Sequence, residues 1–429
     1  MAIHGIAQDK AAAESLLMHY VRDDIPGRFN EAYMLKKEFH RILCCFQGIV
    51  LPPYEVIIQP SSTCNLRCIW CIGERVPITE KNSHTAFILR SSKFMRNKLQ
   101  EQLHDPKIME KVIKNIISYK KYWKYIVNGK HYEKEFKIEN VTFSGLVGEP
   151  LVAKRSIIPA MQLLGTNGIR TGLYTNGELM DESTLDTIVK IAYVNISFDT
   201  ASAKMYRHLK CGNDDNGVMR FNKLLKNIRA LAKLKSKTPG ETCEINASFV
   251  LYPENYREVY NAAVILKDLG IRFFRIKQDI SMEYLLNDQQ KSEVQLLLDK
   301  IKNDLEDRHF KFILIHRLYN PNDMKRDFLE CVVTNLIAAV GSDGNLYPCN
   351  YHPRPNGLIY GSIVHNTFKE VWEGAGGKEI NNRNFQRCPP VCDPFKNRAN
   401  RLLNVAKMLY VVKGASKLQS YIEKIKVPR

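Results

Sequence analysis

Cys64, Cys68 and Cys71 stand close together, with three and then two residues between them. Thiols at this spacing can face one centre, and such a loop can hold one corner of a four-iron, four-sulfur cluster while leaving the fourth iron open. The alternatives are a zinc site or a set of buried thiols. Structural zinc favours paired Cys-x2-Cys knuckles that supply four ligands, and this loop is one ligand short. The spacing therefore favours iron and sulfur.

A second group of cysteines lies near the C-terminal end. It consists of Cys331, Cys349, Cys388 and Cys392. The residues from 331 to 349 are typical of a strand, an Asp-Gly turn and a second strand, so this hairpin carries a cysteine near each end. Four thiolates can close a tetrahedral zinc site or hold a second cluster.

The composition of the chain indicates the cellular compartment in which these thiols lie. The chain has 429 residues, of which 45% are hydrophobic and 11 are cysteine. It shows neither a signal-like start nor an apolar run of about 18 residues, so we expect a cytoplasmic protein that does not cross a membrane. Cysteines in a reducing compartment are typical of metal ligands and not of disulfides.

The net charge of +18 suggests an acidic partner: a phosphorylated or nucleotide-linked substrate, an acidic peptide or nucleic acid. Residues 398–429 carry much of this charge. Because the chain lacks a basic motif interleaved with aromatic residues, a specific nucleic-acid role is not favoured.

The predicted elements place these groups in order. We expect helices over 7–21 and 30–46 and a strand over 55–59 that leads into the first cysteine loop. An insertion over 75–138 then contains a helix over 105–125 and a hairpin turn at Asn128-Gly129. Placed after a first barrel strand, this insertion would overhang the barrel mouth, so it is predicted to be a lid.

From residue 139 onward strand and helix patterns alternate, which predicts a parallel sheet closed or partly closed into a barrel. Polar residues gather where the strands end. They are Gly145, Gly148 and Glu149 in a turn, Thr175 and Asn176, Ser197 and Asp199 with Arg207 and Lys210 after them, and Asn246, Ser248, Arg275 and Lys277 on two later strands.

The loop Cys-x3-Cys-x2-Cys, with Trp70 before its third cysteine, resembles the signature of the radical S-adenosylmethionine (radical SAM) superfamily. The resemblance covers about 55–395. It implies an α/β fold, a partial (β/α)6 TIM-like barrel, in which Cys64, Cys68 and Cys71 bind a 4Fe-4S cluster that cleaves S-adenosylmethionine. An electron donor such as flavodoxin or ferredoxin would serve that cluster.

The same resemblance assigns roles at the strand ends. Gly145, Gly148 and Glu149 resemble the Gly-Gly-Glu motif that binds the methionine ammonium, and Thr175 and Asn176 match the third strand. Ser197 and Asp199 occupy the ribose motif, while Arg207 and Lys210 are candidate partners for the cosubstrate carboxylate. Each of these two cations can equally be a surface charge. Trp70 belongs to the cofactor-binding set.

The later cysteines resemble the SPASM and twitch auxiliary-cluster domains. Four cysteines match the shorter twitch form with one auxiliary 4Fe-4S cluster, which would transfer electrons or hold the fold. A tetrahedral zinc site on the same four thiols is the alternative interpretation. Of the remaining cysteines, Cys211 and Cys243 are candidate hydrogen donors for an epimerase, and the simpler interpretation of each is a buried inert thiol.

These patterns predict four parts: a helical N-terminal extension over 1–50, a barrel over 51–310, a twitch-type domain over 320–397 and a basic helical tail over 398–429. The predicted function is hydrogen abstraction from a small polar or anionic substrate, such as a sugar, aminocyclitol or nucleotide derivative, for dehydrogenation, epimerisation or rearrangement in a biosynthetic pathway. One alternative is a peptide-modifying maturase, although the two-helix start does not resemble a leader-binding domain. Another is a non-catalytic iron–sulfur or zinc protein that binds nucleic acid.

Overall fold

The structure is a computed structural model that describes residues 10–71, 100–127, 129–146, 148–238, 240, 243–280, 284–320, 323, 325–353, 358–374, 388 and 392–428. Among these residues ten strands form one sheet, in the order β12-β11-β10-β1-β4-β5-β6-β7-β8-β9. Their bounds are β1 Glu55–Ile58, β4 Asn140–Phe143, β5 Arg170–Thr175, β6 Tyr193–Ser197, β7 Glu244–Leu251, β8 Phe273–Gln278, β9 Lys311–Leu314, β10 Ile337–Val340, β11 Asn345–Tyr347 and β12 Gly361–Ser362.

The strands from β10 to β9 in this order run parallel, and only β11 and β12 are antiparallel. β1 lies between β10 and β4, with Val56 aligned to Ala338 on one side and to Val141 on the other. Nearly every residue of β7 is buried, which is typical of parallel strands covered on both faces. The carboxyl ends of the parallel strands therefore meet along one edge, where the polar residues predicted from the sequence follow them.

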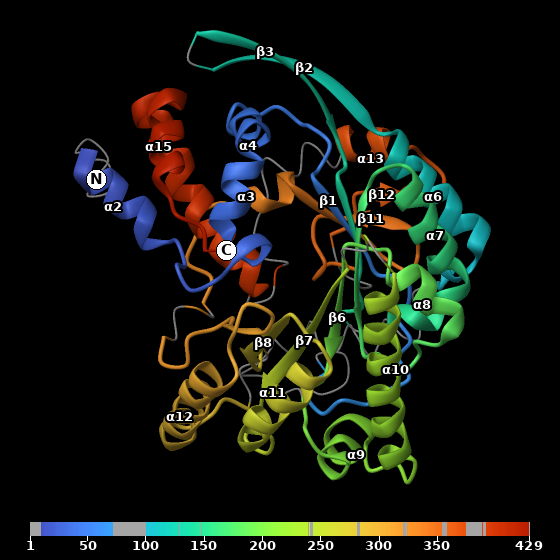
Figure 1. Ribbon diagram of the computed structural model, residues 1–429. Coiled ribbons are helices and arrows are strands. Elements are labelled where there is room, and N and C mark those ends of the chain that lie inside the picture. The colour runs from blue at the N-terminus through green and yellow to red at the C-terminus, as the bar shows by residue number, and fades with distance from the viewer. Residues whose placement is uncertain are drawn as a thin grey trace, which may run out of the picture.

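Helices cover this sheet and its edges (Figure 1). They are α2 Lys10–His19, α3 Glu31–Lys37, α4 Phe39–Phe46, α6 Pro106–Ser118, α7 Lys154–Thr166, α8 Glu182–Ile188, α9 Ala203–Cys211, α10 Gly217–Lys237, α11 Val259–Asp268, α12 Asp288–Asp304, α13 Phe368–Glu373 and α15 Pro394–Lys424. The apolar side chains between the sheet and these helices form a continuous core that runs from Val56 to Trp372.

The two ends of the chain pack together. α15 contacts α2 and α3, and Arg398 Nε lies 3.1 Å from the Glu31 carboxylate in a buried ion pair. Figure 1 shows the blue N-terminal helices beside the red C-terminal helix. The predicted helix over 30–46 is wrong in one respect: Glu38 separates α3 from α4, because its backbone leaves the helical region. The tail is helical as predicted, with a break at Gly414.

The insertion differs more from the prediction. The helix predicted over 105–125 ends at Ser118, and β2 (Lys120–Val127) pairs instead with β3 (Lys130–Lys137). The first residues of β2 alternate between exposed and half-buried, which is the two-residue period of a strand and not that of a helix. The predicted hairpin is confirmed, and Asn128 lies outside the described residues.

The second cysteine region continues the sheet. A short 3-10 helix over Val332–Asn335 leads into β10, and the predicted hairpin is confirmed by β10 and β11, which pair Ala339 with Tyr347 across a turn where Gly344 has φ 71°. Because β10 pairs with β1, this region is joined to the barrel by backbone hydrogen bonds. That this region forms a separate domain over 320–397 stays a prediction.

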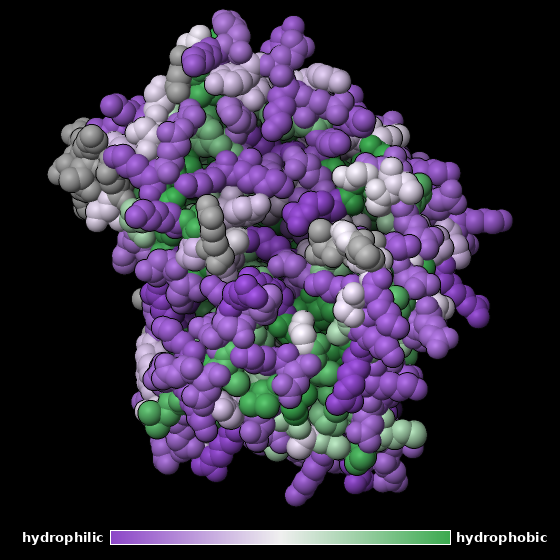
Figure 2. Space-filling view, in the orientation of Figure 1, coloured by the Kyte–Doolittle hydropathy of each residue, from purple (hydrophilic) through white to green (hydrophobic). Residues whose placement is uncertain are grey.

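The face of the molecule in Figure 2 is mostly hydrophilic, in keeping with the high net charge. Among the described helices, none has both the length and the apolar content that crossing a bilayer requires.

Candidate functional site

A cavity of about 460 Å³ occupies the barrel interior. Its wall includes Cys64, Cys68 and Cys71 together with the turn that holds Gly145, Gly148 and Glu149. Thr175, Asn176, Ser197, Asp199 and Lys210 line it as well. The first cysteine group and the strand-end residues predicted from the sequence therefore line the same cavity.

Backbone hydrogen bonds fix the loop of the first cysteine group. Arg67 N donates to Lys210 O at 2.9 Å, and Ile69 N donates to Leu209 O at 2.8 Å, so the loop lies against the last turn of α9. Cys71 N donates to Cys68 O at 3.0 Å and closes the loop on itself. Burial is the main cause that raises the pKa of Cys68 well above its usual value, while the Lys210 charge opposes that rise.

A buried polar network also holds this loop, and the sequence analysis missed it. Asn65 Nδ2 donates to Glu178 Oε2 at 2.8 Å, and Arg220 pairs with the same carboxylate at 2.7 Å. Asn176 Nδ2 donates to Asn65 Oδ1 at 2.8 Å, and Tyr206 OH donates to Glu178 Oε1 at 2.5 Å. The available signal was Glu178 itself, an acidic residue directly after Thr-Asn-Gly at a strand end.

The glycine turn after β4 packs directly on the cysteine loop. A Cβ on Gly148 would stand 2.0 Å from Ser61 O, and a Cβ on Gly145 would stand 1.8 Å from Gly148 O. Glu149 N donates to Thr63 O at 2.9 Å. A side chain at Gly148 would push the turn and the cysteine loop apart, and a side chain at Gly145 would open the turn itself.

Glu149 joins this turn to the end of β5. Its carboxylate accepts hydrogen bonds from Leu151 N at 3.0 Å, Thr175 Oγ1 at 2.6 Å and Asn176 N at 2.7 Å. Burial raises the pKa of Glu149 above its usual value, and these hydrogen bonds act against that rise. The side chain is therefore held firmly at the cavity wall, where it can present an acceptor to a cationic group.

The end of β6 carries a buried ion pair. Asp199 has a left-handed backbone, φ 60°, which is uncommon for a residue other than glycine. Its Oδ2 lies 3.0 Å from Lys210 Nζ, and its Oδ1 accepts from Val250 N at 2.9 Å. Lys210 Nζ also donates to Ser197 O. Burial by itself would lower the pKa of Lys210, but the charges of Asp199 and Cys68 raise it above its usual value.

Two other residues predicted to bind the cofactor, Trp70 and Arg207, lie in different places relative to the cavity. Trp70 lines the cavity, and its ring centroid is 6.0 Å from that of Tyr252. Arg207 does not line it: its guanidinium donates to Asn213 O at 3.1 Å and pairs with Asp215 at 2.8 Å. Arg207 thus closes the loop after α9 on the exposed side, which corresponds to the surface charge that the sequence analysis left open.

The candidate hydrogen donors are also outside the cavity wall. Cys211 is buried at the end of α9, and Cys243 is buried at the start of β7. Burial raises the pKa of both thiols, to about 12 for Cys243. These positions agree with the simpler interpretation of buried inert thiols.

The second cysteine group lies behind the cavity, between β10 and the start of α15. Burial raises the pKa of Cys392 well above its usual value, and the neighbouring Cys331 and Cys349 raise it further. Asn400 Nδ2 donates to Cys331 Sγ at 3.4 Å. Cys388 Sγ lies 3.7 Å from Nε2 of the buried His352. None of these four thiols lines the cavity, but Asn350, Tyr351 and Asp393 beside them do.

His352 was not predicted, because one histidine three residues after a cysteine has no distinctive spacing. Within the described part of the chain, no group of three or more His, Cys, Asp or Glu side chains is arranged to hold a single metal ion. A four-iron cluster differs from such an ion because its ligands bind separate iron atoms.

Comparisons with known proteins address the fold and the second cysteine region. Residues 331–394 match the family model of SPASM, an iron–sulfur cluster-binding domain. This match includes all four cysteines of the second group. A sequence search among curated proteins returned no match.

Solved structures share the fold. The Streptococcus suis SuiB structure bound to S-adenosylmethionine has a TM-score of 0.52 at 15% identity, covering 79% of this chain and 68% of that one. SuiB bound to precursor peptide SuiA has a TM-score of 0.50 at 14% identity, covering 83% and 73%. Native anSMEcpe with bound AdoMet and Kp18Cys peptide has a TM-score of 0.50 at 18% identity, covering 87% and 100%.

These similarities confirm the predicted fold class, an α/β fold with a partial barrel, joined to a region that matches the SPASM model. They establish the arrangement of the strands that carry the strand-end residues. The role of each individual site residue stays a prediction.

Proposed function

We propose that this chain, which combines the radical SAM fold with a SPASM-type region, is an enzyme that cleaves S-adenosylmethionine reductively and abstracts hydrogen from a small polar substrate. One observation carries the proposal: the three cysteines of the first group line the same cavity as Glu149, Asp199 and Lys210. The loop offers the three thiolates that one corner of a cluster needs. A reduced cluster with bound S-adenosylmethionine supplies a 5′-deoxyadenosyl radical.

The residues around the loop fit such a cosubstrate. Gly145 and Gly148 have no side chains, so the turn packs closely against the cysteine loop at the cavity wall. Glu149 offers carboxylate oxygens to an ammonium group. The buried Lys210 ammonium and the Ser197 hydroxyl offer donors to a carboxylate or to ribose oxygens. We assign these residues to orientation of the cosubstrate beside the cysteine loop.

The second cysteine group supports an auxiliary cluster held by Cys331, Cys349, Cys388 and Cys392, because the match to an iron–sulfur domain contains all four. With four protein ligands, that cluster would exchange electrons and would not bind substrate directly. An electron donor such as flavodoxin or ferredoxin and a cytoplasmic location belong to the same proposal.

The cavity also limits the substrate. Pockets for small ligands range from about 300 to 1,000 Å³, and the cluster, the cosubstrate and the reacting part of the substrate must share about 460 Å³, which favours a small reacting group. A sugar, aminocyclitol or nucleotide derivative offers such a group. Because Cys211 and Cys243 stand outside the cavity wall, we favour dehydrogenation or rearrangement over epimerisation through either thiol.

A peptide-modifying reaction is the second candidate function. SuiB bound to precursor peptide SuiA and anSMEcpe bound to the Kp18Cys peptide share this fold at a TM-score of 0.50. A cavity of this size could admit a single side chain of a peptide whose remainder lies outside. The basic surface of the chain would then meet an acidic precursor.

Anaerobic reconstitution tests the proposal. We expect about eight irons per chain and release of 5′-deoxyadenosine that depends on dithionite. Two zinc ions per chain and no cleavage would overturn it in favour of a non-catalytic zinc protein. Incubation with deuterated sugars, aminocyclitols and peptides then separates the two candidate functions, because the true substrate transfers deuterium into 5′-deoxyadenosine.

A further inference from the structure

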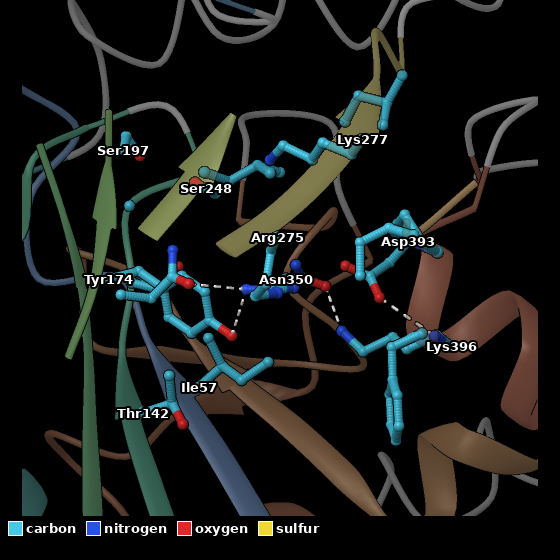
Figure 3. Close-up of a pocket in the computed structure, with 18 of the residues that line it drawn as sticks. Ile57, Thr142, Tyr174, Ser197, Ser248, Arg275, Lys277, Asn350, Asp393 and Lys396 are labelled. Carbon is cyan, nitrogen blue, oxygen red and sulfur yellow. Dashed lines mark hydrogen bonds between the residues drawn. The ribbon is translucent and has the colours of Figure 1, made fainter. Parts of the chain in front are cut away.

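Two cations of β8 face the cavity without an acidic partner. Arg275 and Lys277 are two residues apart, so their side chains leave the same face of the strand. Both line the cavity, and Figure 3 shows them on the strand that crosses its upper part. Neither forms an ion pair with any residue that the structure describes.

The hydrogen bonds of Arg275 leave part of its guanidinium unused. Nη1 donates to Tyr174 OH and to Asn195 Oδ1, each at 3.2 Å, and the ring of Phe29 lies 5.0 Å from the guanidinium carbon. Its Nε is buried and has no partner among the described residues. A buried donor of a charged group without an acceptor is costly, so an acceptor from a ligand would complete this site.

The side-chain ammonium of Lys277 forms no hydrogen bond with the described residues. Burial lowers the pKa of Lys277 below its usual value, and the nearby Arg275 charge lowers it further. Asp199, Asp279 and Asp393 act in the opposite direction, but the net direction is downward. The acids of the described chain therefore offset the positive charge on β8 only in part.

Three other cations of the cavity do contact a protein group. Lys210 pairs with Asp199, Arg398 pairs with Glu31, and Lys396 donates to Asn350. Asp393 accepts from Lys396 N at the start of α15. Figure 3 shows Arg275 reaching toward Tyr174 on one side and Lys396 reaching toward Asn350 on the other.

The place of Arg275 separates it from the cosubstrate residues. Its contacts Tyr174 and Asn195 precede Thr175 and Ser197 on their strands by one and two residues. It therefore lies deeper than the strand ends, on the amino-terminal side of the residues assigned to S-adenosylmethionine.

We propose that Arg275 and Lys277 form a binding site for an oxyanion of the substrate, either a carboxylate or a phosphate. The inference rests on the proposed function, because it assigns the site to the substrate. It narrows the substrate class from polar molecules in general to those with an anionic group near the hydrogen that is removed. Arg275 offers its buried Nε, which the bonds of Nη1 to Tyr174 and Asn195 hold in place, and the Lys277 ammonium contacts the same group from the mouth side.

Equilibrium dialysis of the reconstituted holoenzyme against radiolabelled inorganic phosphate, with saturating S-adenosylmethionine, tests this site. We expect one saturable site per chain, and Lys277→Met should weaken phosphate binding at least tenfold. Lys277→Gln serves as a second variant if Lys277→Met does not fold. Lys233→Met, which changes an exposed lysine of α10, should leave phosphate binding within a factor of two. Displacement by acetate indicates a carboxylate substrate, and resistance to acetate indicates a phosphate substrate.

Three results would overturn the site: no saturable phosphate binding to the wild type, equal affinity in the wild type and in Lys277→Met, or an equal loss of S-adenosylmethionine affinity. The last result would assign the two cations to the cosubstrate. A wild type that binds phosphate through Lys277 but never cleaves S-adenosylmethionine would overturn the proposed function and leave the anion site standing. Cleavage of S-adenosylmethionine without phosphate binding would support the proposed function and overturn the anion site.

Discussion

The two walls of the cavity differ in whether their charged side chains have partners within the protein. On the wall built from the cysteine loop and β4 to β7, Glu149, Asp199 and Lys210 are buried and bonded to protein partners. On the wall built from β8, Arg275 and Lys277 have no acidic partner among the described residues. The first wall is a preformed scaffold, whereas the second is electrostatically incomplete until a ligand binds. Substitutions should therefore cost stability on the first wall and ligand affinity on the second.

Loss of a first-group thiol should have the largest effect. We expect Cys68→Ala to abolish S-adenosylmethionine cleavage and to lower the iron content by about four per chain, with the second cluster retained. Cys44→Ala, which changes a buried thiol of the N-terminal helices, is the matched control and should keep both. Iron analysis and 5′-deoxyadenosine release measure the outcome, and cleavage by Cys68→Ala would disprove the assignment.

The contrast between the walls is sharpest for two lysines. Lys210→Met leaves Asp199 buried without its cation, so we expect a loss of about 3–5 kcal/mol in unfolding free energy. Lys277→Met removes an uncompensated charge, so its stability should stay within about 1 kcal/mol of the wild type or rise. Denaturant unfolding of the two apo variants compares them directly. Equal losses would show that the two walls do not differ in this way.

Close packing of the first wall predicts a smaller effect for Gly148→Ala. The added Cβ meets Ser61 O at 2.0 Å, so the turn and the cysteine loop must separate, at a cost of about 1–3 kcal/mol. Gly165→Ala in α7 is the control, because nothing lies within 4 Å of its Cβ position. The ratio of bound iron to protein should fall only for Gly148→Ala; an unchanged ratio would argue against this packing.

The buried His316, which lies near the Lys277 charge of the second wall, predicts a modest dependence of stability on pH. Burial, followed by the charges of Arg398, Lys277 and Arg22, lowers the pKa of His316 to about 3. Since the unfolded pKa is about 6.5, the unfolded chain binds this proton more readily, and stability present above pH 6.5 is lost as the pH falls toward 3, by about 1.4 kcal/mol at pH 5.5.

Unfolding free energies at pH 7.5 and 5.5 measure this dependence. His316→Gln should reduce the difference between the two values by about that amount, and His365→Gln, at an exposed histidine, should leave it unchanged. If the unfolding free energy changed equally between pH 7.5 and 5.5 in the wild type and both variants, His316 would not be the cause of the pH dependence.

The sequence predicted those parts of the site whose chemistry is local. The cysteine spacing, the glycine turn and the polar residues that end β5 and β6 all fall on the cavity wall. Contacts between distant segments were not predictable in this way. Glu178 meets Arg220 from another element, and Arg275 reaches Tyr174 across the barrel, so neither pairing has a signature in the spacing. The helix predicted over 105–125 failed at β2, because the pairing with β3 outweighs the local pattern there.

The pairing of β10 with β1 has a consequence for redox chemistry. β1 leads into the loop of the first cysteine group, and the chain reaches Cys349 directly after β10 and β11. Backbone hydrogen bonds across this pair fix the spacing between the two cysteine groups, with no hinge between the strands. Electron transfer between the proposed centres would therefore take place over a constant distance. Its rate would be governed by the difference in their reduction potentials and not by a slow motion of one domain relative to the other.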